Sequence, residues 1–174
     1  MPAPPRHGST ATAGRPGPAT AYVGLGANLG NARGSVLGAA RELAAVRGVS
    51  NLRLSPLYRS TPVDAGGPDY VNAVAVLDTT LDAPALLDEL QRIEHAHGRQ
   101  RPYRNAPRTL DLDLLLYGDA AMDTPRLTLP HPRMHERAFV LRPLLDLAPG
   151  MRLAQGTLEE LLARCAGQAL HPLP

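Results

Sequence analysis

The chain has 174 residues, 44% of them hydrophobic, which is enough for one ordinary domain with a buried core. Its longest apolar runs are too short to cross a bilayer, we find no secretory signal, and the single cysteine, Cys165, cannot form an internal disulfide, so we expect a globular cytoplasmic protein. A net charge of +2 does not favour nucleic acid as a partner, and we expect neither a nucleic acid nor a membrane to bind.

The first half of the chain predicts a tail followed by alternating strands and a helix. Residues 1–19 are dense in Pro, Ala, Gly and Thr, and they predict a disordered tail before a single domain over 20–174. The elements expected next are a strand at Ala21–Leu25, a helix at Ala32–Val46, and strands at Val49–Tyr58 and Tyr70–Thr79.

The second half predicts further helices around one conspicuous strand. In chain order we expect a helix from about Pro84 to His97 capped by Asp82, a basic loop at Arg99–Arg108 and a strand at Thr109–Tyr117. A short pairing segment near Leu127–Leu129 follows, and then a helical region at Met134–Leu147 that Pro143 kinks or divides. A capping box at Thr157 begins the last helix.

This element order predicts an α+β fold. The strands before and after the loop at Ser60–Pro68 favour antiparallel pairing, and the whole pattern is typical of an αβ sandwich with helices packed on a mainly antiparallel sheet. Gly24 and Gly26 lack the third glycine of a dinucleotide-binding fingerprint, and no Walker-type glycine-lysine loop is present, so Rossmann and P-loop enzymes are disfavoured.

Two carboxylates in the conspicuous strand are candidate metal ligands. Alternation places Asp111 and Asp113 on one face, about 6.6 Å apart, while Leu110, Leu112 and Leu114 take the other face and anchor the strand in the core. Carboxylate oxygens are ligands that Mg²⁺ accepts, and a metal pair fits between two such groups. An ordinary polar strand face is the alternative.

Arginine dominates the basic residues and is concentrated before and after this strand. All 18 basic residues are arginine, and seven of them fall between positions 99 and 137. Arg108 precedes Asp111 by three residues, so a basic loop runs into an acidic strand, as a phosphate-and-metal site requires. Taken alone, the arginines could equally be a solvated surface stripe.

A few further side chains could contact a nucleotide or a flat heterocycle. His131 lies in a Pro-His-Pro run and could contact a phosphate, or it could be a structural histidine. Tyr70 and Phe139 could stack on a heterocycle, although core packing is the simpler interpretation. Asn72 shares a strand face with Tyr70 and could bond the heterocycle's edge.

Seven motifs together resemble the 6-hydroxymethyl-7,8-dihydropterin pyrophosphokinase family, over about residues 21–149. They are GLGANLG at Gly24–Gly30, YRSTPV at Tyr58–Val63, PDYVNA at Pro68–Ala73, QRIE at Gln91–Glu94, GRQR at Gly98–Arg101, PRTLDLD at Pro107–Asp113 and LPHPRM at Leu129–Met134. The chain departs from the family at Asn105-Ala106, where Trp-Gly is common, and at Pro102-Tyr103, in a region that often holds a lysine.

The resemblance implies a ferredoxin-like sandwich that transfers pyrophosphate from ATP to the hydroxymethyl group of a dihydropterin in folate synthesis. It implies two Mg²⁺ ions held by Asp111 and Asp113. The implied catalytic residues are Arg99, Arg108, Asp111 and Asp113; the implied ATP contacts are Gln91, Glu94, Arg99, Arg108, Arg126, Thr128, His131 and Arg137; and the implied pterin contacts are Thr61, Pro62, Val63, Tyr70, Asn72 and Phe139.

Two other classes stay open at this point. A non-catalytic nucleotide- or pterin-binding module could share the fold, and Asn105 is the residue that favours it. A metal-dependent nuclease is more distant, because the chain is nearly neutral.

Overall fold

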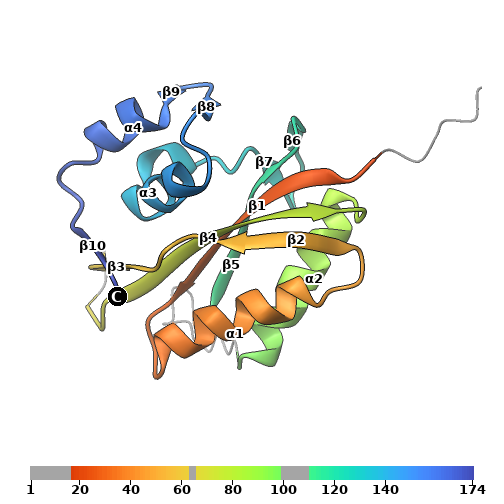
Figure 1. Ribbon diagram of the computed structural model, residues 1–174, viewed down its shortest axis with the longest axis horizontal. Coiled ribbons are helices and arrows are strands. Elements are labelled where there is room, and N and C mark those ends of the chain that lie inside the picture. The colour runs from red at the N-terminus through yellow and green to blue at the C-terminus, as the bar shows by residue number, and fades with distance from the viewer. Residues whose placement is uncertain (1–16, 63–65, 99–109) are drawn as a thin grey trace, which may run out of the picture.

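The computed structural model describes residues 17–62, 66–98 and 110–174, and it contains a six-stranded sheet with helices on both faces (Figure 1). The sheet strands are β1 (Ala19–Ala27), β2 (Val49–Leu54), β3 (Tyr58–Ser60), β4 (Tyr70–Thr79), β5 (Asp111–Tyr117) and β10 (Leu170–Pro172). Two small hairpins pair β6 (Met122–Asp123) with β7 (Thr128–Leu129) and β8 (Arg152–Leu153) with β9 (Gly156–Thr157).

All of the strand pairs in the sheet are antiparallel. Along one path the order is β10-β3-β4-β1-β5, and β2 also pairs with β4, so β2 and β3 share one side of the long central strand. The antiparallel pairing expected across the loop at Ser60–Pro68 is therefore confirmed, and so is the α+β sandwich with a mainly antiparallel sheet.

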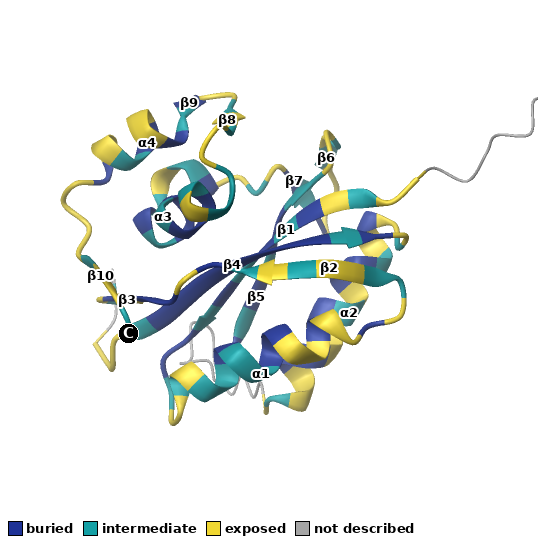
Figure 2. Ribbon diagram, viewed as in Figure 1, coloured by how far each residue is buried: buried dark blue, intermediate teal, exposed yellow. Residues whose placement is uncertain are grey.

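Two pairs of helices cover the two faces of the sheet. One face packs against α1 (Ala32–Ala44) and α2 (Ala83–Ala96), and the other packs against α3 (Ala138–Leu147), which carries α4 (Leu158–Arg164) on its outer side (Figure 1). Because both faces are covered, β4 is buried almost throughout, as Figure 2 shows, and its sequence reads as a nearly continuous apolar run.

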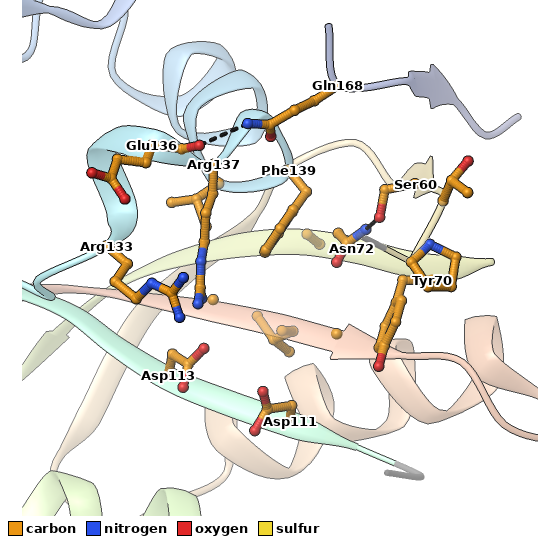
Figure 3. Close-up of a pocket in the computed structure, with 17 residues that line it drawn as sticks. Ser60, Tyr70, Asn72, Asp111, Asp113, Arg133, Glu136, Arg137, Phe139 and Gln168 are labelled. Carbon is orange, nitrogen blue, oxygen red and sulfur yellow. Dashed lines mark hydrogen bonds between the residues drawn. The ribbon is translucent and has the colours of Figure 1, made fainter. Parts of the chain in front are cut away.

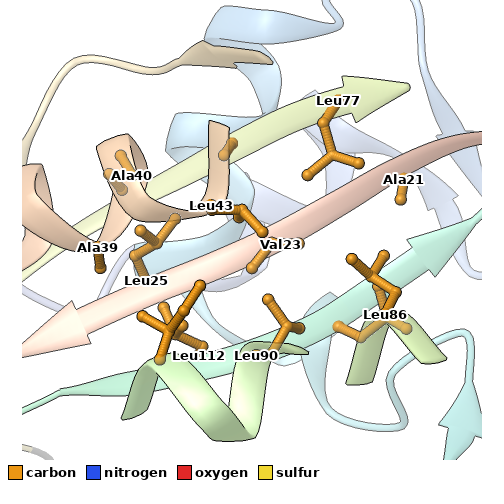
Figure 4. Close-up of a cluster of buried hydrophobic side chains, with 14 of the residues drawn as sticks. Ala21, Val23, Leu25, Ala39, Ala40, Leu43, Leu77, Leu86, Leu90 and Leu112 are labelled. Carbon is orange, nitrogen blue, oxygen red and sulfur yellow. The ribbon is translucent and has the colours of Figure 1, made fainter. Parts of the chain in front are cut away.

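Side-chain alternation divides the core into two clusters. Odd-numbered residues of β1 and β4 and even-numbered residues of β5 meet the apolar stripes of α1 and α2, with Val23, Leu25, Leu43, Leu90 and Leu112 at the centre (Figure 4). On the other face Val74 and Leu115 join the buried residues of α3 and α4. The polar residues of β5 are thereby turned toward α3.

Among the differences from the sequence prediction, two concern where an element is interrupted. The strand expected over Val49–Tyr58 is interrupted, because Pro56 has no N–H to donate and Ser55 Oγ instead accepts from the Val74 amide at 2.9 Å. The helical region 134–147 divides at Arg137, between the 3₁₀ turn η1 (Met134–Glu136) and α3, while Pro143 lies inside α3.

The predicted helix starts are confirmed. Asp82 accepts from the Ala85 amide at 2.8 Å at the start of α2, and Thr157 and Glu160 form the expected capping box of α4. Of the predicted tail, residues 1–16 lie outside the described residues, and Ala19 already belongs to β1. None of the helices in the described ranges has the length and apolar character that a membrane crossing requires.

Candidate active site

A pocket of about 350 Å³ lies between α3 and the sheet, on the face opposite α1 and α2. Five segments line it: β5, the glycine-containing part of β1, the end of β3 with the start of β4, the η1–α3 junction, and the segment before β10 with Gln168 (Figure 3). The labelled lining residues are Ser60, Tyr70, Asn72, Asp111, Asp113, Arg133, Glu136, Arg137, Phe139 and Gln168.

Asp111 and Asp113 share one face of β5 and both line the pocket, as their spacing predicts. Leu110, Leu112 and Leu114 are at most 4% exposed and pack in the opposite cluster. The strand is thus held by its apolar face, and the two carboxylates are positioned by the core rather than by a loop.

The floor of the pocket consists of backbone. Gly24 and Gly26 lie opposite Asp113 and Asp111 on the neighbouring strand, and Gly26 also pairs with Asn72 on its other side. A Cβ at Gly26 would lie 3.3 Å from Asn72 Oδ1, which is tighter than most such contacts. The missing side chains therefore leave a flat passage from the carboxylates to the amide.

The amide of Asn72 is oriented by a hydrogen bond inside the sheet. Its Nδ2 donates to Ser60 Oγ at 2.7 Å, and both side chains are buried, at 5% and 7% exposure (Figure 3). With the nitrogen turned toward β3, the amide presents Oδ1 above Gly26 as a hydrogen-bond acceptor.

Two aromatic side chains stand on either side of this amide. Tyr70 begins β4, and Phe139 lies in the first turn of α3 (Figure 3). The Arg137 guanidinium lies 5.5 Å from the centroid of the Phe139 ring, so the ring also carries a cation on its face. The pocket thus brings together five of the predicted pterin contacts: Thr61, Pro62, Tyr70, Asn72 and Phe139.

Behind the pocket, α3 is bonded to β3. The Tyr58 hydroxyl donates to Asp146, which also accepts from Arg142. Burial raises the pKa of Tyr58, and the hydrogen bond to Asp146 raises it further, so the hydroxyl keeps its proton at neutral pH. This contact fixes the C-terminal half of α3 over the sheet.

Five of the described ATP predictions lie outside the pocket lining, and four of them, Gln91, Glu94, Arg126 and Thr128, lie on α2 or near the β6–β7 hairpin. Arg126 forms an ion pair with Asp88 and donates to Gln91 Oε1 at 3.2 Å, while Thr128 pairs with β6. Glu94 is 2% exposed, and its carboxylate accepts from the Leu112 amide at 2.9 Å, beside the two aspartates at the edge of β5.

Another predicted ATP residue, His131, lies close to the charges of the pocket. Burial lowers the pKa of His131, the charges of Arg137 and Arg133 lower it further, and the Asp111 carboxylate opposes them. The Arg133 amide donates to His131 Nδ1 at 3.2 Å, so the neutral ring carries its proton on Nε2. Of the predicted ATP contacts described, Arg137 alone lines the pocket itself.

Several predicted residues lie outside the described ranges. They are the pterin contact Val63, the triphosphate contacts Arg99 and Arg108, and the departures from the family pattern at Pro102-Tyr103 and Asn105-Ala106. In the described part of the chain, no three His, Cys, Asp or Glu side chains group as a complete metal site. A carboxylate pair is nevertheless suited to Mg²⁺, which takes its remaining ligands from phosphate and water.

The structure adds pocket residues that sequence reasoning did not select. Ser60, Arg133, Glu136 and Gln168 line the pocket, and the glycines form its floor. The LPHPRM motif contains Arg133, so arginine density could have indicated it. Gln168 comes from a distant segment and carries no local signal.

Comparisons with known proteins agree on one family. The sequence profile described as "7,8-dihydro-6-hydroxymethylpterin-pyrophosphokinase (HPPK)" matches residues 22–149. The 2-amino-4-hydroxy-6-hydroxymethyldihydropteridine pyrophosphokinase of Pseudomonas aeruginosa is 48% identical over 88% of this chain and 96% of its own, and that of Haemophilus influenzae is 44% identical over 77% and 84%.

Solved structures share the fold. An HPPK-DHPS chain of Plasmodium falciparum superposes with a TM-score of 0.67 at 15% identity, over 84% of this chain and 45% of its own, so our chain spans less than half of that protein. An HPPK-DHPS chain solved in complex with substrates gives a TM-score of 0.69 at 12% identity, over 85% of this chain and 43% of its own. With a profile match across most of its length and a relative at 48% identity, the chain belongs to the 7,8-dihydro-6-hydroxymethylpterin pyrophosphokinase family.

Proposed function

We propose that this pyrophosphokinase transfers the pyrophosphate group of ATP to the hydroxymethyl group of 6-hydroxymethyl-7,8-dihydropterin, a step of folate synthesis, in the pocket between α3 and the sheet. One observation carries the proposal. The pocket holds a carboxylate pair on one side and an oriented amide between two aromatic side chains on the other. The carboxylate pair suits a triphosphate with its cations, and the amide between the aromatic side chains suits a flat heterocycle with a polar edge.

The pterin half of the site is built for stacking and edge recognition. Tyr70 and Phe139 flank the ring, and Asn72 Oδ1 accepts from an N–H on its edge. Thr61 and Pro62 close the end of the slot near β3, with Val63 as a predicted contact outside the described residues. The glycine floor allows the ring to reach toward Asp111 without a side chain in its way.

The phosphate half of the site combines acids with arginines. Asp111 and Asp113 would hold two Mg²⁺ ions, which would supply positive charge to the triphosphate. Arg133 and Arg137 add charge from the η1–α3 side. The nucleotide site extends along α2 with Gln91 and Glu94, and around β7 with Arg126, Thr128 and His131. Arg99 and Arg108 remain predicted triphosphate contacts outside the described residues.

The reaction is an in-line displacement at the β-phosphorus. The pterin hydroxyl oxygen forms a bond to that phosphorus and gives up its proton, while the bond to the oxygen shared with the α-phosphate breaks and AMP leaves with that oxygen. The chain's own residues contribute mainly by holding the two substrates in line and by stabilising the charge that develops. Positioning of the substrates and electrostatic stabilisation therefore account for most of the proposed rate acceleration.

The reaction takes place, in this proposal, in the cytoplasm and within a single domain over residues 20–174. Cys165 is a buried free thiol in a chain with one cysteine, which suits a reducing compartment. Two clusters packed on opposite faces of one sheet support a single folding unit.

Nucleotide products test the reaction directly. The purified chain is incubated with ATP, Mg²⁺ and the dihydropterin, and nucleotides are separated chromatographically. AMP should form in equal amount with the pterin diphosphate. ADP as the nucleotide product would contradict pyrophosphoryl transfer, and tight ATP binding without turnover would favour a non-catalytic binding module.

A further inference from the structure

Gln168 bonds the backbone on both sides of Arg137. Its Oε1 accepts from the Ala138 amide at 2.9 Å. Its Nε2 donates to the Glu136 carbonyl at 2.8 Å (Figure 3). An amide can satisfy a donor and an acceptor at once, and these two backbone groups are one of each. The side chain therefore fixes the junction between η1 and α3 at two points.

This junction carries one wall of the pocket. The N-cap of α3 is Arg137, whose side chain makes no capping hydrogen bond within the described part of the chain, so Gln168 supplies an acceptor for the first helical amide. Arg137 follows Glu136, whose carbonyl is bonded, and Phe139 follows Ala138, whose amide is bonded. The Arg137 guanidinium lies 5.5 Å from the centroid of the Phe139 ring. Holding the backbone here holds both side chains.

The same segment is bonded to the opposite wall. Two residues after Gln168, Leu170 begins β10 and pairs with Ser60 of β3. Ser60 in turn holds the Asn72 amide at 2.7 Å. Because two extended residues span at most about 7 Å, a bond at Gln168 and a pairing at Leu170 leave the two walls little freedom to separate.

A second cavity, of about 340 Å³, lies between the walls and this segment. Its lining includes Thr61, Pro62 and Phe139 from the walls and Gly167, Gln168 and Leu170 from the segment. The segment thus forms the outer limit of the space in which Phe139 stands. At the far end of α3, the bond between Tyr58 and Asp146 performs the equivalent attachment to β3.

We propose that residues 168–172 are a brace that sets the width of the pterin slot, with Gln168 as the positioning residue for Phe139 and Arg137. Gln168 lies beyond residues 22–149, the part of the chain that the family profile matches. The proposal rests on the assignment of Phe139 to the pterin site made above. It predicts that loss of the Gln168 hydrogen bonds weakens pterin binding and has little effect on kcat.

The test compares the variants Gln168→Met, Gln168→Glu and Phe139→Ala with a control, Gln155→Met. For each protein we measure kcat, the KM for each substrate, pterin binding in the presence of a non-hydrolysable ATP analogue, and thermal unfolding. Gln168→Met keeps the length of the side chain and removes both hydrogen bonds. We expect its KM for the pterin to rise about fivefold, the size expected for the loss of a helix cap, with kcat and KM for ATP within about twofold of the original. Gln168→Glu keeps the acceptor for Ala138 and should recover part of the loss. Gln155→Met, in the exposed turn between β8 and β9, should behave as the original chain.

Phe139→Ala separates failure of the brace from failure of the site. If Phe139→Ala weakens pterin binding while Gln168→Met leaves it unchanged, the brace is refuted and the site stands. If Gln168→Met lowers only the melting temperature, Gln168 is a stabilising cap without a positioning role, and the proposal is overturned. If Phe139→Ala also leaves pterin binding unchanged, the pterin site itself is elsewhere and the brace falls with it.

Discussion

At the scale of single residues, the carboxylates of β5 combine the strongest sequence signal with the clearest placement. Asp113→Ala removes a proposed magnesium ligand from a polar face and leaves no cavity in the core. We expect turnover to fall by two or more orders of magnitude, about 3 kcal/mol, because the triphosphate charge is less well neutralised. Steady-state rates over a range of magnesium concentrations measure the loss.

Two controls accompany this measurement. Circular dichroism should show an unchanged fold, and Asp119→Ala, in the exposed turn after β5, should keep the original rate. A folded Asp113→Ala protein with a near-normal rate at ordinary magnesium would rule out metal binding by this pair.

The glycine floor makes a second prediction at the residue scale. In Gly26→Ala the new methyl group would lie 3.3 Å from Asn72 Oδ1, so the amide must shift or the methyl must occupy the space of the ring. We expect pterin affinity to fall about tenfold, in line with the roughly 1–3 kcal/mol that overpacking costs, and ATP affinity to change little. Calorimetry with each ligand tests this.

Gly38→Ala is the matched control, because its Cβ would make an ordinary 3.6 Å contact with His97 on the other side of the sheet. Unchanged pterin affinity in Gly26→Ala would mean that the ring does not rest on this floor.

At the scale of elements, the capping box of α4 is expected to contribute stability without taking part in binding. Thr157 Oγ1 accepts from the Glu160 amide at 3.2 Å, and α4 packs on the outer side of α3. Thr157→Ala should lower the free energy of unfolding by about 1 kcal/mol and leave both KM values unchanged.

Thr157→Ser provides the comparison, because it keeps the capping hydroxyl and should recover most of the stability in denaturant titrations. Equal losses in the two variants would assign the effect to the threonine methyl group rather than to the cap.

Elements with a local cause could be predicted from the sequence. The cap at Asp82 and the leucine face of β5 depend on neighbours within a few residues, so their patterns are visible in the chain. At the break at Ser55–Leu57, Pro56 is a local signal that the sequence carries, whereas the Ser55 Oγ contact with the Val74 amide, nineteen positions away, could not be predicted in the same way.

The same distinction applies to the site. Strand alternation indicated the two aspartates, and the resemblance favoured pterin stacking over core packing for the aromatic pair. Gln168 contacts Glu136 from thirty-two positions away, and periodicity carries no information about a contact of that kind.

At the scale of the whole molecule, His131 links protonation to stability. Its pKa is lowered in the folded chain from the ordinary 6.5, chiefly by burial, so the unfolded chain binds the proton more readily. The contribution of this group to stability is therefore complete above pH 6.5 and is lost as the pH falls below that value toward the folded pKa.

We expect the melting temperature of the original chain to fall more steeply between about pH 7 and pH 5 than that of His131→Gln, since the variant no longer takes up this proton on unfolding. His95→Gln, on the exposed side of α2, serves as the reference. Parallel pH profiles for the His131 variant and the original would show that the ring is equally easy to protonate in both states.

The backbone floor of the pocket has a consequence for how the site can change under selection. Resistance to an inhibitor often arises when a residue that contacts it is replaced by one with a smaller side chain. A glycine has no side chain that a substitution could shorten. Substitution at Gly24 or Gly26 can only add atoms, and at Gly26 the first added atom already crowds Asn72. An inhibitor that lies flat on these two residues therefore uses a surface that mutation cannot withdraw without also obstructing the proposed substrate.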